Sequence, residues 1–500
     1  MRNFFKKIKY SYIKKSCLKS DFLNVLSPGA LLLLAAIAAP VAANADEFTL
    51  PADYSRYKVF DKVVFYDGYI SDRIVDGDLE DGTLRFSNYH YARPLNVEEV
   101  LDLGCDFRLE VIVGALCDNY DRMGRVMLAF PEAGSVNYDP QAVERIEIAR
   151  FITPFMNKNK LPDEVPYIYD LDDLRQLLAD PELLSGRDVW MEVEIFGIPY
   201  DANKKVKGCE QRNDVFAATV SFAGHESSAA ETSQKATKIP NAGNPAVLTP
   251  ITISKCEIHG NVNFNNYNEV ATDTLGVTTK TFNFDVPADL TDAQINFILT
   301  NHGAGENGEE YVRRQHLVYV DGDIAMVYTP GGVSCEPYRK YNTQGNFIYG
   351  SSPEDDWEEW NNWCPGQAVP TRKIQLGAMK AGRHKLMIRV PDAEFYGNDG
   401  DFRPSAYLQG VTSGKISDLS VTDLIEDSKN SISLKAEGRD IIILAAKPIL
   451  ELRVYSYDGT LLLGNYNPGS RFTLPQLPSG QYIVVASTED GDSAFVKVII

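Results

Sequence analysis

Three segments of this 500-residue chain contain acidic residues that could take part in acid–base chemistry. In CDNYDR (residues 117–122), Asp121 lies between Tyr120 and Arg122. A carboxylate held among aromatic side chains can have a raised pKa and exchange protons near neutral pH. Taken alone, an aspartate beside an arginine is more often part of a surface salt bridge. We interpret Asp121 as a candidate acid–base residue and Arg122 as a partner that keeps a carboxylate ionised.

The other two segments contain glutamates. Glu192 and Glu194 are two residues apart in WMEVEIF (190–196), so in a strand both side chains point to one face. Glu310 lies in GEEYVRRQH (308–316). The simpler interpretations are a solvated strand face for the first two and one more exposed residue of an acidic run for the third.

Aromatic side chains and a histidine could bind a ligand beside these carboxylates. Tyr311, Trp360 and Trp363 lie in or near a long aromatic and acidic stretch, residues 331–365. Flat aromatic rings can stack on the apolar faces of sugars, although core or loop packing is the simpler explanation. His302 could donate a hydrogen bond or simply fill space.

After residue 48 the pattern is mostly β, which predicts an all-β fold to position these residues. Short runs rich in Val, Ile, Phe and Tyr alternate with Gly, Asn, Asp and Pro clusters. We predict a first domain at 46–225, a polar linker at 226–247, a second domain at 248–425 and a third at 428–500. Four leucines at helical spacing predict one helix, at about 170–184.

The first 45 residues indicate an exported protein. Basic residues precede an apolar run at 30–39, and Ala43-Asn44-Ala45 then supplies a cleavage site. A membrane anchor is the alternative, but a spanning helix needs roughly 20 apolar residues. The formal net charge of −20 argues against a nucleic-acid partner.

Cysteine and histidine usage favours disulfides over metals. Cys17 leaves with the leader, and an even number of cysteines remains, which is typical of disulfides in exported chains. The pairing stays open from the residues alone. No CxxC or clustered Cys and His motif is present, so we expect neither a metal nor a cofactor.

Several strings resemble the peptide-N-glycosidase F family, over roughly residues 55–420. They are FDKV (60–63), CDNYDR (117–122), EIARFITPF (147–155), KLP (160–162), GEEY (308–311) and WCPGQAVPTR (363–372). The resemblance implies two side-by-side eight-stranded antiparallel jelly rolls with the glycan in the groove between them. It implies an amidase that cleaves between the innermost GlcNAc and Asn of N-linked glycoproteins, which would be its partners; we expect a monomer. Copper-dependent amidating monooxygenases share such a fold, but histidine poverty argues against one.

The same resemblance assigns roles. Asp121 would position and activate the attack, Glu194 would contact sugar with Glu192 as the fallback, and Glu310 would act from the second domain. Cys335 and Cys364 would form a disulfide, whereas Cys105–Cys117 and Cys209–Cys256 are guesses. Trp360 replaces a family arginine, and His302 stands where the family carries an aromatic turn. A glycan-binding surface protein without turnover is therefore the second hypothesis.

The third domain resembles the C-terminal sorting domain of the type IX secretion system of Bacteroidota. The matching strings are LRVY (452–455), LPSGQYIV (477–484) and VKV (496–498). This implies export by that machinery, with the tail cut off and the protein released or attached to the cell surface. A small carbohydrate-binding sandwich is the alternative for this domain. A calcium module at 76–82 is disfavoured, because the stretch lacks the Gly and Glu of an EF-hand loop.

Overall fold

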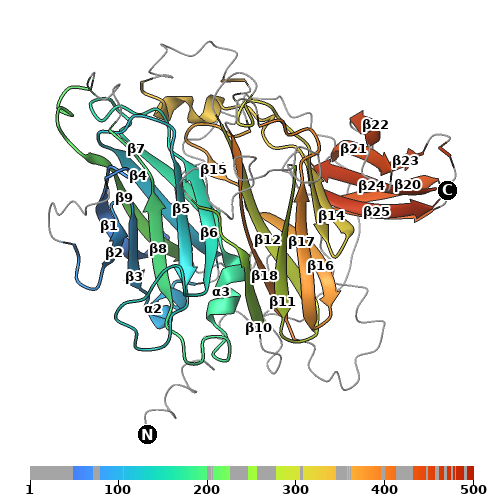
Figure 1. Cartoon of the computed structure of the whole chain (residues 1–500), viewed down its shortest axis with the longest axis horizontal. Helices are drawn as coiled ribbons and strands as arrows, with labels where there is room; N and C mark the ends of the chain where they lie inside the picture. Colours follow the sequence, from blue (N-terminus) through green and yellow to red (C-terminus); the bar gives the residue numbers. More distant parts are fainter. Residues whose placement is uncertain are drawn as a thin grey trace, which may run out of the picture.

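A computed structural model describes most of the chain between residues 49 and 499 (Figure 1). The described ranges are 49–70, 79–104, 106–199, 204, 206–225, 246–255, 278–303, 308–344, 357–358, 360, 362–395, 400–412 and, within the C-terminal part, 432–437, 439–445, 449–456, 461–466, 470–474, 477–478, 480–488 and 493–499. The predicted leader, most of the linker, Cys105 and Cys256 lie outside these residues, as does Asp458-Gly459, a dipeptide that predicts a hairpin turn in the third domain. Among the described residues, no helix is long and apolar enough to cross a membrane.

The first domain is a sandwich of two antiparallel sheets. One has the strand order β1-β9-β4-β7 and the other β15-β6-β5-β8-β3-β2. Its strands are β1 (Ser55–Tyr66), β2 (Leu84–Ser87), β3 (His90–Pro94), β4 (Asp106–Ala115), β5 (Met123–Ala129), β6 (Arg145–Ile152), β7 (Glu164–Asp170), β8 (Trp190–Ile195) and β9 (Asp214–His225). Alternation explains the core, since Phe107, Leu109, Val111 and Val113 of β4 are all buried on one face.

Two short helices join these strands. The predicted helix is α3 (Asp172–Leu178), and it buries Leu174, Leu177 and Leu178 against the core. It ends well before residue 184 because Asp180 precedes Pro181, and a residue before proline avoids the α conformation. Helix α2 (Val97–Leu101) was not predicted; it is a single short turn.

The second domain is a similar antiparallel sandwich, with sheets of order β10-β18-β12-β16 and β11-β17-β13-β14. The strands are β10 (Ala246–Thr252), β11 (Thr279–Val286), β12 (Leu290–His302), β13 (His316–Val320), β14 (Asp323–Tyr328), β16 (Arg372–Met379), β17 (Gly382–Arg389) and β18 (Asp401–Val411). A short 3-10 helix, η2 (Glu336–Tyr341), lies in the predicted long loop. The prediction of an all-β fold with side-by-side sandwiches is confirmed.

The two sandwiches share a seam, which we define as the contact between β6 of the first domain and β12, β15 and β18 of the second (Figure 1). Strand β15 (Ala368–Val369) follows the second-domain loop but pairs with Phe151 and Arg150 of β6. Backbone pairing thus joins the two domains directly. Any residue near the end of β6 is close to both domains.

The C-terminal residues form a third, smaller sandwich with its own apolar core. Its strands are β19 (Ile432–Glu437), β20 (Asp440–Ala445), β21 (Ile449–Ser456), β22 (Leu461–Tyr466), β23 (Arg471–Thr473), β24 (Gln481–Thr488) and β25 (Ser493–Ile499). Tyr455, Ile483 and Val485 pack against Leu317 and Tyr319 of β13. The third sandwich therefore covers the outer face of the β13–β14 hairpin.

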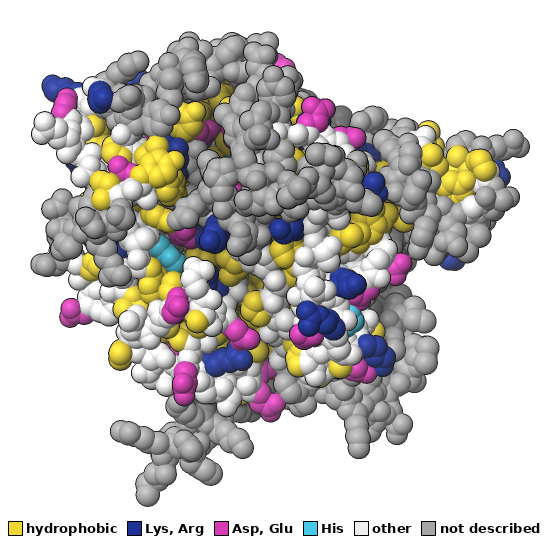
Figure 2. Space-filling model, viewed as in Figure 1, with side chains coloured by type: hydrophobic (Ala, Val, Ile, Leu, Met, Phe, Trp, Pro, Cys, Tyr) yellow, Lys and Arg dark blue, Asp and Glu magenta, His cyan; other side chains and the backbone are white. Residues whose placement is uncertain are grey.

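The surface of the face shown in Figure 2 mixes acidic and basic side chains without gathering either sign into one large patch. On this face, the described acidic and basic side chains therefore form no single site for a polyanion or a polycation.

Candidate active site

Asp121 lies in the connection between β4 and β5, and Thr153 fixes that connection on both sides of it. The Thr153 hydroxyl accepts a hydrogen bond from the Arg122 backbone N–H at 2.7 Å and donates to the Tyr120 carbonyl at 2.8 Å. The Thr153 backbone N–H donates to the Arg122 carbonyl at 2.8 Å. Thr153 is fully buried just beyond the end of β6. The backbone flanking Asp121 is thus attached to the seam strand.

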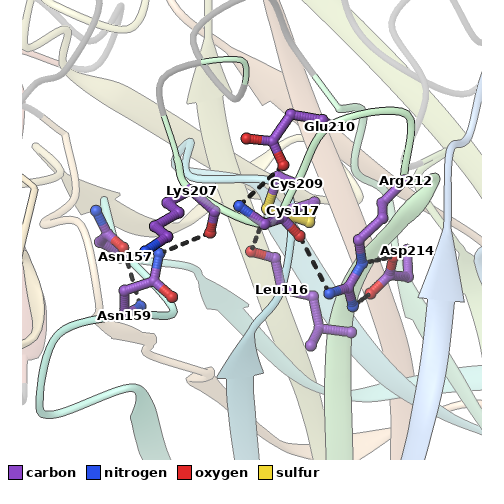
Figure 3. The surroundings of a disulfide bond; sticks show 10 residues. Leu116, Cys117, Asn157, Asn159, Lys207, Cys209, Glu210, Arg212 and Asp214 are labelled. Carbon is purple, nitrogen blue, oxygen red and sulfur yellow. Dashed lines mark hydrogen bonds and ion pairs between the residues drawn. A yellow bond between two sulfur atoms is a disulfide. The ribbon is translucent and has the colours of Figure 1, made fainter.

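A disulfide and a buried aspartate support the same connection. Cys117 bonds to Cys209, which corrects both guessed pairings, because the loop at 206–212 folds back over the start of CDNYDR (Figure 3). Asp118 accepts hydrogen bonds from the backbone N–H groups of Tyr120 and Ile198. A turn held by a disulfide and by an aspartate side chain gives Asp121 a defined backbone position.

Arg122 pairs with Asp118, not with Asp121. Its Nε donates to Asp118 Oδ2 at 2.7 Å, and its guanidinium lies 4.8 Å from the centre of the Tyr120 ring. Asp118 is fully buried, so it holds the arginine close. Arg122 therefore lowers the pKa of Asp118 against the larger effect of burial, and its charge likewise only partly offsets the other effects on the pKa of Asp121.

Glu310 is presented by the second domain, on a loop that Glu309 anchors. Buried Glu309 pairs with Arg314 at 3.0 Å and accepts backbone hydrogen bonds from Glu394 and Phe395. With its neighbour held inside, Glu310 remains partly exposed, and one of its oxygens accepts a hydrogen bond from the Gly303 backbone N–H at 3.2 Å. The local structure thus directs Glu310 away from the core of the second sandwich.

Asp121 and Glu310 interact electrostatically across the seam. Burial raises the pKa of Asp121 well above its ordinary value, and the nearby Glu310 charge raises it further. The pKa of Tyr311 is also raised, by burial and then by the charges of Glu310 and Asp121. Asp121 and Glu310, which we call the carboxylate pair, form one electrostatic cluster with Tyr311. Two acids whose charges interact in this way can hold one proton between them, which suits general acid–base work.

Glu194 lies elsewhere than the resemblance implied. It is buried on β8 of the first domain and pairs with Arg125, whose Nε donates to it at 2.7 Å. The register of β5 with β8 places Arg125 directly opposite Glu194. Among the described residues it makes no ion pair or hydrogen bond with Asp121. Arg125 also donates to the Ser254 carbonyl of the second domain, so the Glu194–Arg125 pair favours a role in joining the domains over contact with sugar.

Glu192, the fallback, is a structural residue. It is fully buried and bonded to His90 at 2.9 Å, Tyr138 at 2.8 Å and Arg145 at 3.0 Å. Burial raises its pKa, but the hydrogen bond and charge of His90 and the charge of Arg145 outweigh that effect and lower it. A carboxylate with all these partners is not available to a ligand.

The aromatic candidates divide into one exposed ring and two packed ones. Tyr311 is 44% exposed beside Glu310, so its ring can meet a ligand. Trp363 is only 4% exposed: it packs on Met123 and Ile152, and its indole N–H donates to the Asn301 carbonyl at 3.0 Å. The expectation that the Trp363 ring offers an open face for a sugar to stack on is therefore wrong. Trp360 packs 5.9 Å from the Phe155 ring across the seam.

The remaining predicted residues are His302 and the two cysteines of the aromatic loop. His302 is half-buried at the end of β12, directly before Gly303, and its ring centre lies 6.0 Å from that of Trp363. Cys335 and Cys364 form a disulfide, the pair that the resemblance implied, and it closes the aromatic loop. Among the described residues, no group of three His, Cys, Asp or Glu side chains could hold a metal ion.

Sequence reasoning missed the residues that hold the site together. Thr153, Asp118 and Arg150 are buried polar residues, and none had been given a role. Two of them lie in EIARFITPF, a string that was noticed only as a family signature. A polar residue inside an apolar strand was the available signal, because burying a polar group requires a partner.

Two sequence models of one family match this chain. The model described as "Peptide-N-glycosidase F, N terminal" matches residues 57–212, and that described as "Peptide-N-glycosidase F, C terminal" matches residues 266–409. Together the two matches cover more than half of the 500 residues. No curated protein sequence matches.

Solved structures of the same kind are similar to this chain. A structure described as PNGF-II is 21% identical over 72% of this chain and 66% of that chain, just under two thirds of its length, with a TM-score of 0.51. A structure of PNGase F from Flavobacterium meningosepticum is 16% identical over 72% of this chain and 96% of that chain, with a TM-score of 0.42. The first likeness shows the shared fold.

Proposed function

Because this chain belongs to the peptide-N-glycosidase F family, we propose that it hydrolyses the amide between the innermost GlcNAc and asparagine of N-linked glycoproteins. The reaction would release the intact glycan and convert the asparagine to aspartate. The observation that supports this most is the carboxylate pair, since Asp121 and Glu310 come from different domains and the charge of Glu310 raises the pKa of Asp121.

The geometry suits this chemistry in the following way. Water adds to the side-chain carbonyl carbon of asparagine, and its proton goes to a carboxylate of the pair. The carbon–nitrogen bond then breaks, and the leaving glycosylamine nitrogen takes a proton back. A pair that holds one proton between two acids can serve both steps. Tyr311, exposed beside Glu310, would contact the first sugar.

The test is direct. Purified protein incubated with a denatured N-glycoprotein in 18O-water should release glycan and leave aspartate carrying 18O at the former glycosylated asparagine. Retention of the glycoprotein without release would instead support the second hypothesis, a binding protein of the same fold. If the protein neither releases the glycan nor retains the glycoprotein, both hypotheses lose their support.

The pH dependence of glycan release should follow the raised pKa of Asp121. Activity as a base requires the carboxylate, so the rate should fall on the acid side at a pH well above the ordinary range of aspartate. Glu310→Gln removes the second-largest cause of the raised pKa and leaves burial and the smaller effect of the Asp118 charge, so the acid limb should move to lower pH. Single-turnover release across the pH range measures this. An acid limb at the same pH in both proteins would contradict the electrostatic coupling.

We also infer that the protein is exported, with the first 45 residues as the signal peptide and the C-terminal sandwich as a type IX sorting domain that the secretion machinery recognises. The leader pattern and the strings in residues 452–498 support this. Its location would be outside the cell or on the outer surface, where N-linked glycoproteins are encountered. Fractionation of the native host with antibodies against each domain tests this.

A further inference from the structure

Arg150 is the central buried residue of the seam. It belongs to β6 of the first domain, is fully buried, and binds both domains at once. Within its own strand it bonds to Glu147 at 2.6 and 2.9 Å. Across the seam its guanidinium donates to the Arg403 carbonyl at 2.6 Å, to Thr300 Oγ1 and Ser254 Oγ at 2.8 Å each, and to Ser405 Oγ at 3.1 Å.

Thr300 extends these contacts toward the carboxylate pair. Its Oγ1 lies 2.8 Å from Arg150 Nη1 and 2.8 Å from His302 Nε2. Arginine can only donate, so the Thr300 oxygen accepts from Arg150. The hydroxyl hydrogen is then left for His302 Nε2, or for the sulfur of Met123 at 3.8 Å, which is a much weaker acceptor. The Thr300 oxygen can accept a second hydrogen bond, so the 2.8 Å contact fits a hydroxyl that donates to His302 Nε2 as well as an Nε2–H that donates to the hydroxyl. The first arrangement gives the hydroxyl hydrogen its strongest acceptor, and it is the one on which the inference is built.

An imidazole that accepts at Nε2 is neutral and has its hydrogen on Nδ1. The surroundings of the ring agree. Burial lowers the pKa of His302 well below its ordinary value, and the charges of Arg403 from β18 and Arg150 from β6 lower it further. The other group against the ring is the uncharged Trp363. Among the described residues, Nδ1 has no hydrogen-bond partner, so its N–H is available to a ligand.

We propose that Arg150, Thr300 and His302 form a relay that fixes the His302 ring as an Nδ1–H donor to a sugar or amide oxygen of the substrate. Arg150 and Thr300 are positioning residues, and His302 is the one that touches substrate. The next residue, Gly303, holds Glu310 by its backbone N–H, while Thr153, three residues after Arg150, holds the Asp121 connection. One strand thus positions both sides of the site. The substrate part of this inference rests on the proposed function.

The first test needs no catalysis. The chain has six histidines, so 15N-histidine labelling with a His302→Phe variant for assignment resolves the His302 ring. The wild type should show a protonated Nδ1 and an unprotonated Nε2 that do not titrate between mildly acidic and neutral pH. Thr300→Val should shift the tautomer balance, and Thr300→Ser should keep it. A ring protonated at Nε2, or one that titrates like a free histidine, would overturn the relay.

The second test uses substrate. Adding a glycopeptide with a two-GlcNAc core should move the Nδ1 resonance in wild type, and an unmoved resonance would rule out contact with substrate. In kinetics, Thr300→Val should lower kcat about tenfold with little change in KM, and Thr300→Ser should restore it. In the His302→Phe background, Thr300→Val should cost nothing further. An equal loss in both backgrounds would mean that Thr300 does not act through His302.

The two failures are distinguishable. If the wild type releases no glycan, the proposed function is wrong, yet the tautomer measurement and the glycopeptide titration still decide the relay. If glycan is released and the ring has its hydrogen on Nε2, the relay is wrong and the function stands.

Discussion

Asp121→Asn should abolish glycan release while leaving the protein at least as stable as the wild type. The substitution keeps the size and one oxygen of the side chain but removes its ability to take and return a proton. General acid–base catalysis contributes about 10²–10⁴-fold, so we expect a loss of at least about 10²-fold. Release from a saturating glycopeptide, followed by mass spectrometry of the peptide, measures this.

The stability expectation follows from the raised pKa. Between its ordinary value and its raised value, the folded protein binds more protons at Asp121 than the unfolded chain does, so stability falls as pH rises through this range. An asparagine at position 121 does not titrate, so this loss of stability with rising pH is absent. The melting temperature at neutral pH should therefore stay equal or increase. Asp323→Asn, at an exposed position of β14, is the control and should change neither activity nor melting. An active Asp121→Asn protein would contradict the assignment of Asp121 as the acid–base residue.

The strands and two of the three acidic segments were predictable because their signals are local. Alternation marks β4 and β8, and CDNYDR and GEEY mark the segments of Asp121 and Glu310. The partner of each buried charge was not predictable, because strand register decides it. Glu194 lies opposite Arg125 only through the pairing of β5 with β8, and a shift of one residue would place it on the other face.

Distance in sequence explains the other corrections. The Cys117–Cys209 disulfide joins residues 92 apart, and Trp363 is buried because β12 and β5 meet over it. Composition contains no information on such contacts. The same holds for Arg150, whose partners Thr300 and Ser405 lie in another domain. A site at a seam is thus the part of this fold that local pattern determines least.

Arg150→Met should destabilise the two-sandwich unit by about 3–5 kcal/mol, the usual cost of removing one partner of a buried ion pair. Glu147 is fully buried, and among the residues that the structure describes it would keep only Arg125 at 3.7 Å and the hydroxyl of Ser405. Burial raises the pKa of Glu147, but the charge and hydrogen bonds of Arg150, with Arg125, outweigh it and hold the pKa below its ordinary value. Without Arg150, the effect of burial dominates and the pKa of Glu147 should lie above its ordinary value. The variant should then lose stability as pH rises, since its folded state holds a proton that the unfolded chain releases.

Two matched variants separate the buried charge from a general effect of losing an arginine. Arg187→Met removes a partly exposed arginine paired with Glu144, and it should cost no more than about 1 kcal/mol. Arg150→Met combined with Glu147→Leu removes both charges and should recover much of the loss, because neither ion then remains unpaired. Thermal unfolding at several pH values measures all three proteins. If Arg150→Met and Arg187→Met melt alike, the seam is held by apolar packing and backbone pairing alone, and the charges of β6 contribute to its chemistry and not to its stability.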